Sequence, residues 1–341
     1  MYSFLVPNYF KWLRESIAEI LRKTESSRQD VDDRLNALED SVAQIRRIVE
    51  RMERLDHVHD RFDSIDNQLV RMQEDMKCFQ GNWQAEVISK SEDVSNSLLY
   101  RRMSTIYKLL HVKDIDASVH GEICRVGNEN DGGYVMLNDY ASSNIAYSFG
   151  IFDDVSWDKC MAASGLDVYM YDHTIDALPE ENPKFHWEKT GITGLYDANE
   201  IQLKTLPMLL EENNHSNEKN MILKMDVEGA EWEVLGNLSV DILSRFDQIL
   251  LELHGLNNDD EYDVIVDGLE KLNETHQLVH IHANNYGNYR MMAGMVLPDV
   301  IECTYLSKEK YSFRESEKFF PEDIDNRNQR YWPDILLGRM N

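Results

Sequence analysis

Three acidic residues stand close together where a buried stretch of this sequence gives way to a helical one. Residues 221–235, MILKMDVEGAEWEVL, place Asp226, Glu228 and Glu231 around one glycine. The run Met221–Met225 is typical of a buried strand, and the apolar spacing after it predicts a helix packed on that strand. Ligands of open α/β sheets bind outside the carboxyl ends of the strands. These acids therefore mark a candidate site.

The elements that position this site alternate along the chain from about residue 91 onward. Strand-like runs occupy Ile145–Phe149, Asp167–Tyr171, Phe185–Lys189, Met221–Met225, Gln248–Leu253 and Leu278–His282. Helical stretches separate most of them, including Val155–Ser164, Leu206–Glu212 and Tyr262–Leu272, and an amphipathic helix with Leu98 and Leu110 leads in. Strands that alternate with helices predict an α/β fold, with a mostly parallel sheet covered by helices on both faces.

The turn after the first of these strands would carry a nucleotide cofactor. It contains Gly150 but no second or third glycine, so it lacks the GxGxxG dinucleotide pattern. This argues against a dehydrogenase. Asp172 ends the next strand, at the place where an acid typically accepts the hydroxyls of a ribose, although such a residue is more often part of a turn.

Composition excludes several classes of protein. The 341 residues carry a net charge of -27, which argues against a nucleic-acid surface. The four cysteines match neither a metal site nor a disulfide framework, there is no apolar run long enough to span a bilayer, and the start lacks the features of a signal peptide. These features predict a cytoplasmic protein.

The N-terminal quarter of the chain differs from the rest. Residues 24–85 carry two heptad runs of apolar residues, which predict a coiled coil and hence a homo-oligomer of undetermined order. Residues 1–23 mix aromatic and basic side chains, so they predict either a peripheral contact with the inner face of a membrane or a segment that docks on a protein. Residues 86–119 form the predicted linking helix, and residues 120–341 the globular domain.

The string LKMDVEGAEWEVL resembles the hallmark segment of the FkbM-type methyltransferases, a branch of the class I S-adenosylmethionine-dependent fold. The resemblance extends across most of residues 120–341. It includes RVGNENDGGYVML, YSFGIFDDVSWD, YMYDHT, ILLELH and HIHANNYGN, and it covers no part of the coiled coil. The late segments LPDVIECTYL and YWPDILL are similar to the closing strands of such domains. The resemblance implies a Rossmann-like methyltransferase with S-adenosylmethionine as its cofactor.

The resemblance also implies which residues bind that cofactor. Gly150 and the turn through Asp153 correspond to the first cofactor motif, with Asp172 as the ribose acid and Asp226 beside them. The sequence departs from many methyltransferases in having Phe152 and two acids where further glycine or asparagine is common. The DGGY turn is expected to fold over the same pocket, although a DG pair can also be a simple hairpin turn. Its candidate residues are Asp131, Gly132 and Gly133.

Methyl transfer to an alcohol needs alignment and a base. His254, at the end of a predicted strand, is the candidate base, and strand alternation places Glu252 on its face. Asp226 ends the neighbouring strand, so Asp226, Glu252 and His254 could hold Mg²⁺ or Mn²⁺, which would lower the pKa of the acceptor hydroxyl. The alternative is that Glu252 and His254 form a hydrogen-bonded pair that only holds a loop.

Further polar residues predict a carbohydrate acceptor. His280 and His282 share a strand face ahead of two asparagines, and amide groups suit sugar hydroxyls because they both donate and accept. The candidate substrate-binding residues are Glu228, His282, Asn284 and Asn285. The predicted function is O-methylation of a sugar or glycan. The alternative is a coiled-coil scaffold whose Rossmann-like domain binds a ligand without turning it over.

Overall fold

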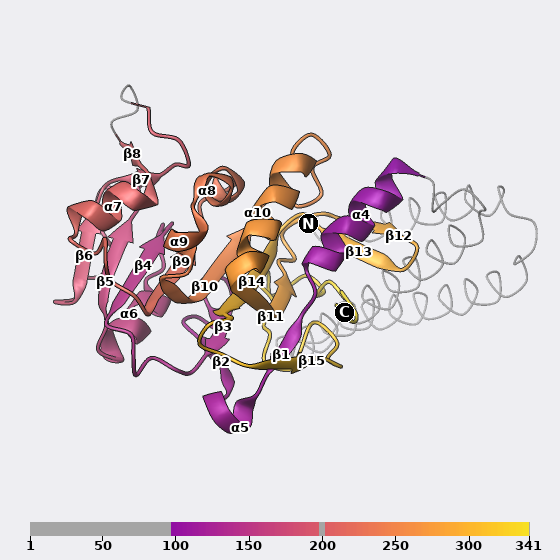
Figure 1. Cartoon of the computed structure of the whole chain (residues 1–341), viewed down its shortest axis with the longest axis horizontal. Helices are drawn as coiled ribbons and strands as arrows, with labels where there is room; N and C mark the ends of the chain where they lie inside the picture. The colour runs from indigo at the N-terminus through magenta and orange to yellow at the C-terminus, as the bar shows by residue number, and fades with distance from the viewer. Residues whose placement is uncertain (1–96, 198–201, 341) are drawn as a thin grey trace, which may run out of the picture. The chain divides into compact units, whose positions relative to one another are not determined.

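The computed structural model describes residues 97–197 and 202–340 (Figure 1). The predicted segment 1–23 and the predicted coiled coil 24–85 lie outside the described residues. Of the predicted linking helix of residues 86–119, the structure describes residues 97–119, and these are not one helix: α4 (Leu98–Leu109) is followed by the strand β1 (Lys113–Ile115). The Ser97 side chain accepts a hydrogen bond from the backbone N–H of Tyr100 and so caps this helix.

Seven strands of the described residues form one sheet, in the order β11-β14-β10-β9-β4-β5-β6. Their bounds are β4 (Ile145–Phe149), β5 (Asp167–Tyr171), β6 (Phe185–Glu188), β9 (Met221–Met225), β10 (Phe246–Leu253), β11 (His276–Ala283) and β14 (Ile301–Ser307). Strands β6, β5, β4, β9 and β10 pair in parallel, whereas β14 runs antiparallel to both of its neighbours. Numbered by chain order within this sheet, the strands run 3-2-1-4-5-7-6, an arrangement consistent with an α/β methyltransferase fold.

The other described elements surround this sheet. The helices are α5 (Ala117–His120), α6 (Ser156–Ala163), α7 (Leu206–Glu212), α8 (Glu231–Asn237), α9 (Val240–Leu243) and α10 (Tyr262–Thr275). Short strand pairs join β1 (Lys113–Ile115) to β15 (Phe313–Glu315), β2 (Ile123–Val126) to β3 (Tyr134–Leu137), β7 (Gly191–Ile192) to β8 (Leu203–Lys204), and β12 (Tyr289–Met292) to β13 (Met295–Pro298).

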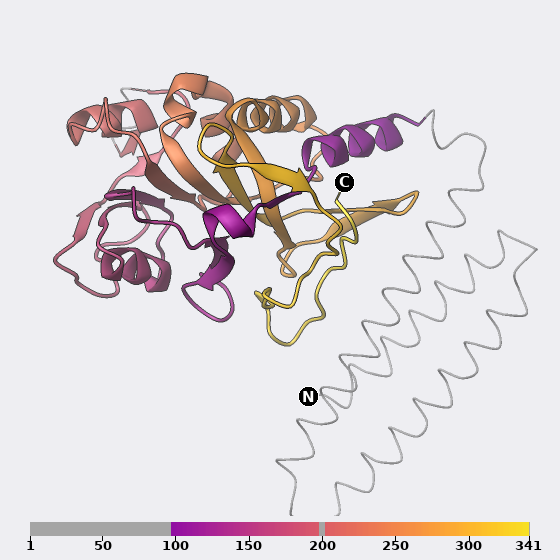
Figure 2. The same cartoon turned by 60° about the horizontal axis from the view of Figure 1, so that its bottom comes forward.

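Both faces of the sheet are covered. Helices α4, α7, α8 and α10 pack on one face, and α6 packs on the other (Figure 2). Strand β9 shows the alternation that permits this, because Leu223 and Met225 belong to the first core and Ile222 to the second. A strand buried on both faces is apolar at nearly every position, as the sequence of β9 is.

The predicted strands and helices are found with small changes at their ends. Strand β10 begins two residues before the predicted start, and α10 continues three residues beyond the predicted end. One prediction was wrong: YWPDILL, residues 331–337, forms no strand. Pro333 has no backbone N–H to donate to a sheet, and this segment is held by side-chain hydrogen bonds from β11 and the loop after it.

Within the part of the chain that the structure describes, no helix is long and apolar enough to cross a membrane.

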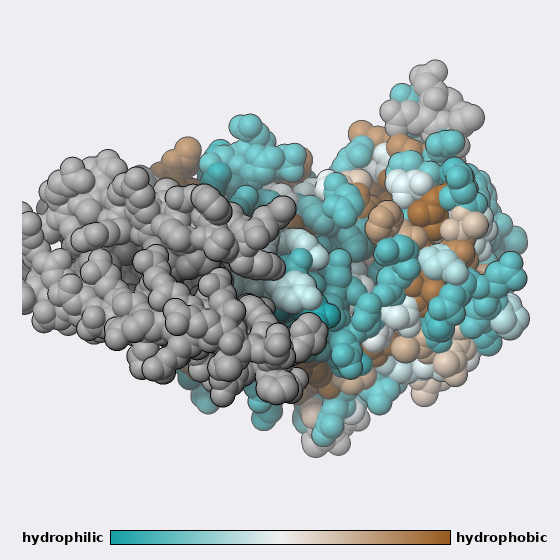
Figure 3. Space-filling view, turned by 180° about the vertical axis from the view of Figure 1, so that it is seen from behind, coloured by the Kyte–Doolittle hydropathy of each residue, from teal (hydrophilic) through white to brown (hydrophobic). Residues whose placement is uncertain are grey.

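Hydrophilic side chains predominate on the described part of the face shown in Figure 3, with apolar ones scattered among them.

Candidate active site

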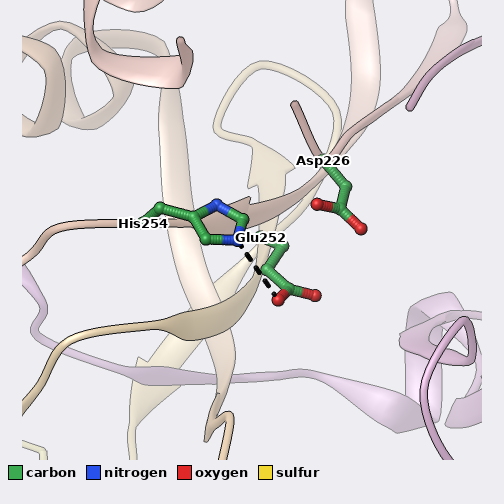
Figure 4. Close-up of side chains that lie close together, drawn as sticks. All are labelled: Asp226, Glu252 and His254. Carbon is green, nitrogen blue, oxygen red and sulfur yellow. Dashed lines mark ion pairs between the residues drawn. The ribbon is translucent and has the colours of Figure 1, made fainter. Parts of the chain in front are cut away.

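Asp226, Glu252 and His254 come together at the carboxyl ends of β9 and β10 (Figure 4). Each can offer one ligand atom, and these atoms lie within 4.8 Å of one another. The Nε2 atom of His254 is 3.6 Å from Oε1 of Glu252. The parallel pairing of β9 with β10 brings the ends of these two strands to the same edge, so the structure forms the three-residue cluster that the sequence predicts.

A fourth residue, Glu231, orients the histidine. Its side chain is fully buried, and its Oε1 lies 3.2 Å from Nδ1 of His254. An ionised carboxylate only accepts hydrogen bonds, so His254 donates Nδ1–H to Glu231, and its Nε2 faces Glu252. Glu231 also accepts from the backbone N–H of Val227 at 2.9 Å and of Gly229 at 3.1 Å. The sequence marks Glu231 as one of the acids of the candidate site, but it does not predict this contact with His254.

Each of the other two cluster residues also has a hydrogen-bonded support. The Tyr134 hydroxyl donates to Oδ2 of Asp226 at 3.1 Å, and the Asn284 amide donates to Oε1 of Glu252 at 2.8 Å. Together with Glu231, these contacts fix all three side chains. Residues that bind metals usually have partners of this kind, which hold the ligand atoms in position.

The cluster brings acidic side chains together in a largely buried place. Burial raises the pKa of Asp226 to about 6, although Lys224 and His254 oppose this effect. Burial, followed by the charges of Asp226 and Glu302, raises the pKa of Glu252 well above its ordinary value. Burial lowers the pKa of His254, but the hydrogen bond to Glu231 and the surrounding carboxylates outweigh it, so that this pKa is raised. A cation here would relieve the repulsion between the carboxylates.

Glu252 also belongs to a second group of acids. Oxygen atoms of Asp131, Glu252 and Glu302 lie within 4.8 Å of one another. The amide of Asn328 joins two of them, donating to Asp131 at 3.1 Å and to Glu302 at 2.5 Å. This contact ties the DGGY turn to the C-terminal segment of the domain.

Gly150 allows the turn after β4 to touch the end of β9. Its φ is +76°, and a Cβ atom at this position would lie 1.5 Å from the carbonyl oxygen of Asp226. The backbone N–H of Asp226 donates to the carbonyl of Phe149 at 3.0 Å. Lys224 strengthens the same junction, since its Nζ donates to the carbonyl of Gly150 at 2.7 Å. A close contact between two loops of the protein therefore requires the glycine at this position.

Asp172 supports this turn from the end of β5. Its Oδ2 accepts the N–H groups of Ile151 and Phe152, each at 2.9 Å, and its Oδ1 accepts from the N–H and hydroxyl of Thr174. Burial raises the pKa of Asp172, but these hydrogen bonds, led by the one from Phe152, outweigh it and lower the pKa. Four internal donors match the roughly four acceptor sites of a carboxylate. Asp172 therefore shapes the turn after β4. Asp153, which lies in the same turn, is exposed.

The DGGY residues form the turn of the β2–β3 hairpin. Gly132 has a φ of +85°, and a Cβ atom on Gly133 would lie 2.0 Å from the carbonyl oxygen of Asn128. The turn itself therefore needs both glycines. The Asn128 side chain donates to Asp154 at 2.9 Å, which holds the hairpin against the loop between β4 and α6. The hairpin thus brings Tyr134 to Asp226.

The candidate substrate-binding residues fall into two groups. Glu228 is 86% exposed, and its Oε2 is 3.4 Å from Nε2 of His254. The others are buried: His282 lies between Glu302 and Asp334, Asn284 holds Glu252, and Asn285 bonds to the loop of residues 329–333. Only Glu228 among the four therefore presents its side chain to solvent beside the cluster.

Two comparisons with known proteins found similarity to methyltransferases. Residues 162–288 match the model of the methyltransferase FkbM domain. This match supports a methyltransferase of FkbM type. The human protein named probable methyltransferase-like protein 24 is 29% identical over 118 residues, which cover 32% of this chain and 32% of the human protein. The chain thus matches about a third of the length of that curated relative. The FkbM match includes the cluster and Asp172, but not Gly150 or the DGGY turn.

Proposed function

We propose that this protein transfers the methyl group of S-adenosylmethionine to a hydroxyl oxygen of a sugar or glycan. The observation that carries the proposal is the cluster of Asp226, Glu252 and His254, which lies within the FkbM match and at the carboxyl edge of the sheet.

The carboxyl ends of β4 and β9 suit the cofactor. The chain order of the strands reverses between these two, and ligands of α/β sheets bind at such switch points. Gly150 and Asp226 lie at these strand ends, and Asp172 holds the turn after β4. Asp153 lies in that turn, and Asp131, Gly132 and Gly133 lie in the turn between β2 and β3. S-adenosylmethionine would supply an electrophilic methyl group there.

Without a cation in the cluster, His254 serves as the general base. Its Nε2 accepts the proton of the acceptor hydroxyl, because Nδ1 is already committed to Glu231. The Glu231 carboxylate then stabilises the imidazolium that forms. Glu228, beside the same Nε2, binds an acceptor hydroxyl as a hydrogen-bond acceptor.

The cluster fits a divalent cation. The two carboxylates suit Mg²⁺ or Mn²⁺, and each of the three cluster residues has a hydrogen-bonded support that fixes it. Such a cation would lower the pKa of the acceptor hydroxyl and orient it. With the cation bound, Nε2 of His254 would be a ligand, and Glu228 would instead accept the proton of the acceptor hydroxyl.

The proposal extends to the whole chain. The coiled coil predicted for residues 24–85 would make the protein a homo-oligomer, and residues 1–23 would attach it to a membrane surface or a protein partner. The proposed location is the cytoplasm.

A variant with Ala in place of His254 tests the proposal. It should lose methyl transfer to a panel of glycans while its calorimetric affinity for S-adenosylmethionine stays near that of the wild type. Excess chelator should abolish activity, and added Mg²⁺ or Mn²⁺ should restore it. Full activity in chelator would reject the cation and leave His254 as the base. Cofactor binding without transfer to any glycan would favour a ligand-binding scaffold.

A further inference from the structure

Three aromatic side chains are exposed on the loops beyond the active site. Tyr286 is 54% exposed, Tyr331 65% and Trp332 50%. The rings of Tyr286 and Trp332 lie 6.2 Å apart between centroids. We call these three residues the aromatic platform. Tyr286 lies within the FkbM match, whereas Tyr331 and Trp332 lie outside it.

The loops that carry the platform are firmly held. Asn285 is buried, and its amide donates to the carbonyls of Gln329 and Trp332 while its oxygen accepts from the N–H of Gln329 at 2.7 Å. Just beyond the platform, Asp334 lies 3.0 Å from Nε2 of the buried His282. The rings are therefore exposed on an ordered backbone, where burial of their apolar area would otherwise be favourable.

The platform lies on the acceptor side of the proposed site. Strands β10 and β11 are both antiparallel to β14, so they run the same way and end at the same edge of the sheet. Tyr286 follows the end of β11, and its N–H donates to Asn284, whose amide donates to Glu252 of the cluster. The proposed cofactor position lies in the other direction along the sheet, at the ends of β9 and β4.

The chemistry of the platform suits a sugar ring. Each ring combines an apolar face with a polar group, and polar side chains border them: Gln329 donates to the Tyr286 hydroxyl, and the Arg330 guanidinium lies 4.8 Å from the centre of the Tyr331 ring. A pyranose has the matching pattern of C–H faces and hydroxyl edges. The net charge of -27 disfavours a polyanionic glycan, which makes a neutral one the better electrostatic partner.

We propose that Tyr286, Tyr331 and Trp332 form a subsite that stacks on a neutral pyranose unit of the acceptor, next to the unit that is methylated. The placement of this subsite on the acceptor side rests on the proposed function. The binding of the sugar itself does not.

The test uses the full chain without cofactor. Saturation-transfer NMR with the methyl pyranosides of glucose, galactose and mannose, and with their neutral tetrasaccharides, should detect binding by the wild type. Trp332→Ala and Tyr331→Ala should each weaken it about tenfold, the order expected for losing one stacking face, while Trp332→Phe should retain most of it. Phe319→Ala is the matched control, because Phe319 is 62% exposed and also has an arginine over its ring.

The outcomes separate this subsite from the proposed activity. An absence of sugar binding by the wild type, or equal binding by wild type and Trp332→Ala, would overturn the subsite whether or not methyl transfer is found. A change in oligomeric state in Trp332→Ala, with unchanged sugar binding, would show that the platform is a protein interface. If an acceptor is found, Trp332→Ala should raise its KM and leave kcat unchanged. Sugar binding through the platform without any methyl transfer would retain the subsite and reject the activity.

Discussion

The substitution Glu231→Gln tests whether the cluster is a metal site. Glu231 is not one of the three candidate ligands, but its Oε1 lies 3.2 Å from Nδ1 of His254. Loss of such a support typically lowers metal affinity about 10–100-fold, or about 1.4–2.8 kcal/mol. Glutamine keeps an oxygen that can accept from Nδ1–H, and a neutral hydrogen bond is roughly half as strong as a charged one. We therefore expect the low end, about a tenfold loss of Mn²⁺ affinity.

Calorimetric titration of the full chain with Mn²⁺ measures this effect. Glu233→Gln is the matched control, because Glu233 lies in the same first turn of α8, is exposed, and removes the same charge without touching His254. Equal Mn²⁺ affinity in wild type and Glu231→Gln, with the fold intact, would refute the orienting role of Glu231. Equal losses in both variants would show that the affinity responds to net charge alone.

Three further predictions follow from other parts of the molecule. Asp172→Ala should weaken S-adenosylmethionine binding by about 1–3 kcal/mol in calorimetry, because the turn at Phe152 loses its acceptor; unchanged affinity would remove Asp172 from the site. His282 has a pKa raised to about 10 because contacts with Asp334 and Glu302 outweigh its burial, so its stabilising contribution is complete below about pH 6.5 and is lost as the pH rises toward 10. The unfolding free energy should fall by up to about 1.4 kcal/mol per pH unit in that range, and a slope that persists in His282→Gln would contradict this assignment. Removal of residues 1–85 should give a monomer by light scattering that still binds S-adenosylmethionine, and a truncated chain that stays oligomeric would show that the globular domains pair directly.

The sheet could be predicted from sequence because its strands are short and apolar. Strands β4 and β5, as well as β9, have the predicted bounds, since each is an apolar run between polar loops. The ends of β10 and α10 differ from the predicted ones. The structure adds Phe246 at the start of β10 and Thr275 at the end of α10, because packing and backbone pairing extend these elements beyond the local sequence pattern.

Of the candidate site, only the residues at the ends of strands could be predicted from the sequence. Asp226, Glu252 and His254 follow from alternation along a strand and from the rule that parallel strands end at the same edge of a sheet. The supports of the cluster come from other segments: Tyr134 lies 92 residues from Asp226 along the chain, and Asn284 lies 32 residues from Glu252. Such contacts depend on the fold as a whole. The same holds for Asn285, whose amide pattern suggests a sugar contact but which bonds to a distant loop.

Two loops at the site are built in a way that packing does not explain. Phe152, between β4 and α6, and Glu228, between β9 and α8, both have positive φ, at 45° and 55°. A left-handed backbone costs a residue with a side chain about 1–2 kcal/mol, and glycine avoids this cost. Both side chains are largely exposed, at 72% for Phe152 and 86% for Glu228, so they recover little of it by burial. Such strain gathers at functional sites. The positive φ of these two exposed residues is therefore a second feature, besides the cluster, that marks this edge of the sheet as the candidate site.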